Sequence, residues 1–113
     1  LLIDTSRKHH EELIQIFQEC GWSISFAQKG RHALDQLRKG DFNLSIVGHV
    51  EDVSAFRLCQ EAQDHKVPSA LADHGVSRQH ANLLKVHGVV KSFEGMSEAS
   101  IRRFARKLRC NQP

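Results

Sequence analysis

Residues 43–49, with the sequence NLSIVGH, decide the fold, because they predict a buried strand that runs out into a loop at Gly48. Two similar runs lie elsewhere in the chain. LLI at residues 1–3 stops at Asp4, and VV at residues 89–90 is followed by Lys91. Short continuous apolar runs bounded by polar residues are typical of strands that are buried on both faces of a parallel sheet.

Amphipathic helical patterns separate these strands. Four stretches place apolar residues three and four positions apart, which predicts helices with one buried face. Their predicted inward residues are Leu13, Ile16, Phe17 and Cys20; Ala33, Leu34 and Leu37; Ala55, Phe56, Cys59 and Ala62; and Ile101, Phe104, Ala105 and Leu108. A further helix is expected after Ser77. Hydroxyl side chains at Thr5 or Ser6 and at Ser97 are expected to cap the first and last helices.

Two more segments complete a regular alternation of strands and helices. Residues 22–27 alternate apolar and polar side chains, which predicts a half-buried strand near a sheet edge. Residues 67–72 predict a fourth strand that is poor in large side chains. Five strands that alternate with helices indicate an α/β fold with a parallel sheet, right-handed crossovers and helices on both faces.

Composition fits one small domain. The chain has 113 residues, of which 40% are hydrophobic and 26% charged, and no apolar run approaches the ~20 residues of a membrane span. A formal net charge of +3 does not by itself indicate a nucleic-acid-binding protein. Three cysteines without a CxxC pair favour a reducing, cytoplasmic setting. We expect the domain to span residues 1–109, with residues 110–113 beginning a linker or marking the boundary of the cloned fragment.

The element order and the separations from Asp4 to Gly48 to Lys91 resemble the receiver domain of two-component response regulators, over essentially the whole chain. This resemblance implies a flavodoxin-like (βα)5 sandwich with a five-stranded parallel sheet in the order 2-1-3-4-5. The intervals from Gly48 to Asp73 and from Asp73 to Lys91 are tighter than the family's. The third and fourth helices are therefore expected to be shortened.

The same resemblance places five positions at the phosphorylation site, and most of them depart from the family. The family's paired acids correspond to Asp4 and Thr5, its phosphoacceptor aspartate to Gly48, its hydroxyl residue to Asp73 and its lysine to Lys91. Glycine offers no nucleophile, and a single secure acid is a poor Mg²⁺ site. The site is therefore predicted to be degenerate, without catalytic residues, bound metal or cofactor. The chain is predicted not to be an enzyme.

These departures predict a pseudo-receiver of bacterial signal transduction, outside the usual phosphorelay chemistry. It would act by protein–protein interaction with other domains of a larger regulator or hybrid kinase, with a separate signalling protein, or as a homodimer. Arg102, Arg103 and Arg106 on the last helix are a candidate interaction surface. A solvated face, with cations favoured near a helix C-terminus, is the simpler interpretation. Neither DNA contact by this domain nor membrane association is expected.

Several alternatives remain open at this point. Lys91 is expected to pair with Asp4 or Asp73, with a small-anion site as the alternative. The eight histidines are expected to be solvated at the surface. A second function, small-ligand or metal sensing, would use a strand-end cleft around Asp4, His49, His74 and Lys91. A third would place the phosphoacceptor at Asp52, although this residue lies four positions beyond Gly48.

Overall fold

The computed structural model describes residues 1–4, 10–72, 89–93 and 96–110, and for residues 89–92 and 109–110 it describes the backbone. Within these ranges strands and helices alternate, except that β5 is the next described element after β4. They are β1 (Leu2–Ile3), α1 (Glu11–Glu19), β2 (Phe26–Ala27), α2 (Gly30–Lys39), β3 (Ser45–Val47), α3 (Ala55–Asp64), β4 (Ser69–Leu71), β5 (Val89–Ser92) and α5 (Glu98–Cys110).

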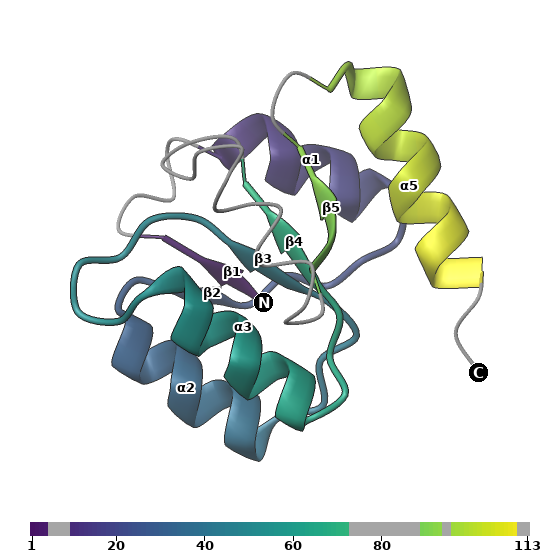
Figure 1. Cartoon of the computed structure of the whole chain (residues 1–113). Coiled ribbons are helices and arrows are strands. Elements are labelled where there is room, and N and C mark those ends of the chain that lie inside the picture. The colour runs from purple at the N-terminus through teal and green to yellow at the C-terminus, as the bar shows by residue number, and fades with distance from the viewer. Residues whose placement is uncertain (5–9, 73–88, 94–95, 111–113) are drawn as a thin grey trace.

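The strands form one sheet in the order β2-β1-β3-β4-β5, and every neighbouring pair is parallel. Figure 1 shows α2 and α3 together on one face of this sheet and α1 and α5 on the other. The predicted flavodoxin-like class, a parallel sheet between two helical layers, is confirmed. The carboxyl ends of the neighbouring strands β1 and β3 therefore lie side by side.

The core is divided by the sheet into two clusters. Because side chains alternate along a strand, Leu2 and Ile46 pack toward α1 and α5, whereas Ile3 and Val47 pack toward α2 and α3. All four residues are buried. Burial on both sides is what the continuous apolar runs predicted, and it fixes the strand ends that carry Asp4 and Gly48.

The second strand is shorter than predicted. Regular pairing covers two residues, Phe26–Ala27, although Trp22 and Ile24 keep the expected half-buried alternation. The indole N–H of Trp22 donates to the carbonyl oxygen of Ala105 in α5 at 3.1 Å. This contact draws the start of the segment toward α5, so it packs on a helix instead of joining the sheet.

Helix α3 differs from its predicted orientation. Its buried face carries Leu58, Cys59 and Ala62, and Phe56 is 36% exposed. The prediction that Phe56 faces inward was wrong, because the sheet contacts select the Leu58 side of the helix. α3 has ten residues, as many as α2, and its shortening relative to the receiver family stays a prediction. The predicted fourth helix lies outside the described residues.

Helix ends agree in part with the predicted caps. The hydroxyl of Ser97 accepts a hydrogen bond from the backbone N–H of Ser100 at 3.2 Å, as expected. Thr5 and Ser6 lie outside the described residues. Helix α5 runs to Cys110, one residue beyond the predicted end of the domain at residue 109. No helix in the described ranges is long and apolar enough to cross a membrane.

Candidate functional site

The site is built where β1 and β3 end. Ile3 is paired with Val47 in the parallel register, so the next residues, Asp4 and Gly48, leave the sheet together. The backbone N–H of Gly48 donates to the carbonyl of Ile3 at 2.7 Å, and that of Asp4 donates to the carbonyl of Ala27 at 3.1 Å. The backbone of the site is therefore held by the sheet itself.

The carboxylate of Asp4 is buried and contacts His10 and His49. Its Oδ2 lies 2.8 Å from Nε2 of His10 and accepts a hydrogen bond from the backbone N–H of His49 at 2.8 Å. Asp4 and His10 are each 5% exposed. A buried carboxylate is costly unless it is hydrogen-bonded, and an ionised Asp4 requires the proton of His10 on Nε2. The pair therefore joins the end of β1, the start of α1 and the loop after β3.

Gly48 is the residue that allows this arrangement. A Cβ placed on Gly48 would overlap Oδ2 of Asp4 and would lie 2.9 Å from both Cγ of Asp4 and the carbonyl oxygen of Ile3. Contacts under 3.0 Å essentially never occur for a real Cβ, so any side chain would force a shift. The Asp4 carboxylate thus occupies the space in which a side chain at position 48 would begin.

The loop after β3 is held at a second point by Asp52. Its carboxylate oxygens accept hydrogen bonds from the backbone N–H groups of Gly30 at 2.8 Å and Arg31 at 3.1 Å. These bonds, from Arg31 first and then Gly30, lower the pKa of Asp52 below its ordinary value. Lys29, the residue before α2, makes no side-chain cap, so Asp52 caps α2 from another part of the chain.

Asp52 was considered above as an alternative phosphoacceptor. Both of its carboxylate oxygens bind the first turn of α2, and its role as a phosphoacceptor stays a prediction. The sequence carries no local signal for the contact with α2, since Asp52 and Gly30 are 22 positions apart.

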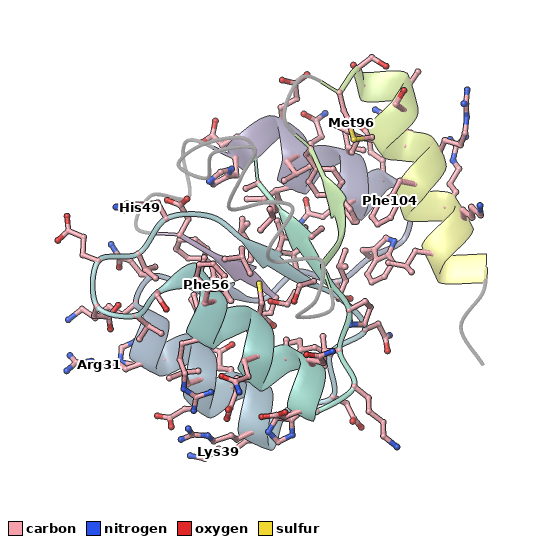
Figure 2. The ribbon with its side chains drawn as sticks, in the orientation of Figure 1. Arg31, Lys39, His49, Phe56, Met96 and Phe104 are labelled. Atoms are coloured by element: carbon pink, nitrogen blue, oxygen red, sulfur yellow. The ribbon has the colours of Figure 1, made fainter. Side chains whose placement is uncertain are left out.

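The structure describes part of the predicted site. Asp4 and Gly48 are adjacent, and His49 contributes its backbone N–H while its side chain is exposed (Figure 2). Thr5, Asp73 and His74 lie outside the described residues. Lys91 is paired in register with Ala70 on β4, but its side chain is not described, so its predicted ion pair stays a prediction. In the described part of the chain no three His, Cys, Asp or Glu residues are grouped to hold a metal ion.

His10 is the residue that sequence reasoning missed. It was expected among the solvated histidines, and that prediction was wrong for this position. His10 directly precedes α1, and its ring turns inward to the buried Asp4. A histidine six residues after an acid is not a recognisable motif, so no local pattern could have identified the pair.

The three arginines of the predicted interaction surface on α5 differ in their contacts. Arg102 is 26% exposed and forms ion pairs with Glu19 of α1 at 2.5 Å and Glu98 of α5 at 2.7 Å. The hydrogen bond from Arg102 is the main cause that lowers the pKa of Glu19. Arg103 and Arg106 are exposed. Arg102 therefore joins two helices, and the open part of the surface lies beside it.

The sheet order β2-β1-β3-β4-β5 is the flavodoxin-like order, which flavodoxins and CheY-like proteins share. No family model matches the chain, and no curated protein matches it. Solved structures do match it.

A CheY-like response regulator receiver domain protein from Methanospirillum hungatei JF-1 has a TM-score of 0.78 at 13% identity, covering 98% of this chain and 95% of its own. A putative response regulator from Chloroflexus aurantiacus J-10-fl has a TM-score of 0.80 at 15% identity, covering 97% and 96%. A two-component response regulator from Clostridium difficile has a TM-score of 0.78 at 17% identity, covering 98% and 96%. The chain therefore has the receiver fold, and this likeness concerns the fold alone.

Proposed function

We propose that this chain is a receiver-like signalling module that takes no phosphoryl group at position 48 and acts by protein–protein contact. One observation carries the proposal. The Asp4 carboxylate fills the space in which a phosphoacceptor side chain at Gly48 would begin. The site has thus lost the acceptor and has also closed over its position.

The chemistry of phosphoryl transfer supports this interpretation. The reaction needs a nucleophile and a Mg²⁺ ion held in near-octahedral geometry by oxygen ligands. Gly48 supplies no nucleophile. Oδ2 of Asp4 already interacts with His10 and His49, so a cation at this oxygen would compete with two short contacts inside the protein. The Asp4 carboxylate therefore disfavours a bound Mg²⁺ ion, and it also occupies the space of a nucleophilic side chain at position 48.

The contacts of the loop after β3 support a fixed conformation. Asp4 binds the backbone at His49, near the beginning of this loop, and Asp52 further along the loop binds the first turn of α2. Two carboxylates from different elements therefore hold one loop. We propose that the module presents a constant surface to its partner, with no phosphorylation step to change it.

The test is phosphorylation of the purified chain with acetyl phosphate and Mg²⁺, followed by intact-mass measurement. The proposal predicts no phosphorylated species, whereas an ordinary receiver treated in parallel gains phosphate. Stoichiometric phosphate on the wild-type chain would contradict it. Peptide mapping of such a product would show whether Asp52 is the acceptor. A Gly48→Asp variant is expected to remain largely unmodified, because Asp4 occupies the required space.

The partner is proposed to be another domain of the same chain or a separate signalling protein. Within the described ranges, Phe56 is the one large hydrophobic side chain that is exposed. Stable apolar interfaces need a larger patch than one phenyl ring. The contact surface of the described part of the chain is therefore polar or charged.

A further inference from the structure

The outer face of α5 carries a stripe of three cations. Arg103, Arg106 and Lys107 are exposed, and their i, i+3, i+4 spacing places them on one side of the helix. The opposite side of α5 packs against the core through Ile101 and Ala105. Figure 2 shows Phe104 on the inner side of this helix, toward the sheet. We refer to Arg103, Arg106 and Lys107 as the α5 stripe.

The α5 stripe is not neutralised within the described part of the chain. No ion pair or side-chain hydrogen bond there involves any of its three residues. Arg102, on the flank of the same helix, is balanced by Glu19 and Glu98. The contrast between paired and unpaired arginines on one helix marks the outer face as the place where positive charge is available to a partner.

Two occupants are disfavoured by the charges themselves. A two-fold dimer through this face would set the same three cations against each other, because an isologous interface repeats one patch. DNA is the second. Proteins that depend strongly on phosphate contacts neutralise roughly six to ten of them, and the α5 stripe offers three cations.

We propose that the α5 stripe docks an acidic segment of a partner protein. This inference deepens the proposed function by naming the surface and the chemistry of the partner. Carboxylates spaced along one side of a helix or strand would meet the three cations in turn. Because the stripe is exposed, the charges would mainly set association rate, register and salt dependence.

The experiment measures binding of the whole chain to a short fluorescein-labelled oligo-glutamate peptide by fluorescence anisotropy at low and at physiological salt. The test variant is Arg103→Glu/Arg106→Glu/Lys107→Glu. The matched control is Lys29→Glu/Lys39→Glu/Lys66→Glu, which exchanges three exposed cations outside α5 for the same change in net charge. The proposal predicts salt-sensitive binding that the α5 variant weakens about tenfold or more and that the control largely retains.

Three results of the binding experiment would overturn the inference. They are no peptide binding by the wild-type chain at low salt, equal loss in both triple variants, and tighter binding of a double-stranded DNA of matched charge. Concentration-dependent dimerisation that the α5 variant abolishes would also contradict it. None of these results bears on phosphorylation at position 48, so failure here and failure of the proposed function can be told apart.

Discussion

The charged side chains of the strand-end site have partners within the fold, whereas those of the α5 stripe have none in the described part of the chain. At the strand ends, Asp4 is buried against His10, and Asp52 is bound by two backbone amides. On α5, Arg103, Arg106 and Lys107 extend into solvent. A buried charge is costly unless it is hydrogen-bonded, whereas an exposed charge is solvated by water. Charge at the strand ends is therefore bound within the fold, whereas the charge of the α5 stripe is available to a partner.

The largest expected effect comes from adding one methyl group at the strand-end site. Gly48→Ala should lower the free energy of unfolding by about 2–4 kcal/mol, because the new Cβ overlaps the Asp4 carboxylate and crowds the Ile3 carbonyl. Urea denaturation of wild-type and variant chains measures this. A loss comparable to an ordinary surface substitution would show that the site is open after all.

The next effect concerns the partner of the buried acid. His10→Ala should cost about 1–3 kcal/mol, since it removes a hydrogen-bond partner from a buried carboxylate. His32→Ala, at an exposed position of α2, is the matched control and should be nearly neutral. Equal effects of the two substitutions in thermal unfolding would show that His10 does not stabilise the buried Asp4 carboxylate.

Asp52 should show a smaller and pH-dependent effect. Its pKa is lowered in the folded chain, so its stabilising contribution is present above the pKa of an unfolded aspartate and is lost as pH falls through the folded value. Asp52→Ala should therefore reduce hydrogen-exchange protection of the Gly30 and Arg31 amides near neutral pH, and this deficit should vanish in acid. Unchanged protection at neutral pH would show that the cap is unimportant.

The smallest effect is expected on the other side of the comparison. Exposed charges without partners contribute little to folding, so the α5 triple variant should change stability by no more than about 1 kcal/mol. Chemical denaturation measures this as well. A strong destabilisation would mean that the stripe belongs to the fold and is not a free surface.

The alternation of apolar runs and amphipathic stretches was enough to predict the layered parallel fold. Because strands in such a sheet end at one edge, the sequence also predicted that Asp4 and Gly48 come together. It did not predict the His10 contact or the Asp52 cap, because both depend on how distant segments meet in space. The prediction that Phe56 faces inward was wrong for a related reason. An apolar residue beside the buried face of a helix fits the helical spacing pattern almost as well as a residue on that face.

The most direct test of the central claim is a double-mutant cycle between positions 4 and 48. If the Asp4 carboxylate occupies the space of a side chain at Gly48, Gly48→Ala should cost at least about 1 kcal/mol less in an Asp4→Ala background than in the wild type. Strictly additive costs would show that the two positions do not compete for the same space, and would contradict the proposal that Asp4 closes position 48 to a phosphoacceptor.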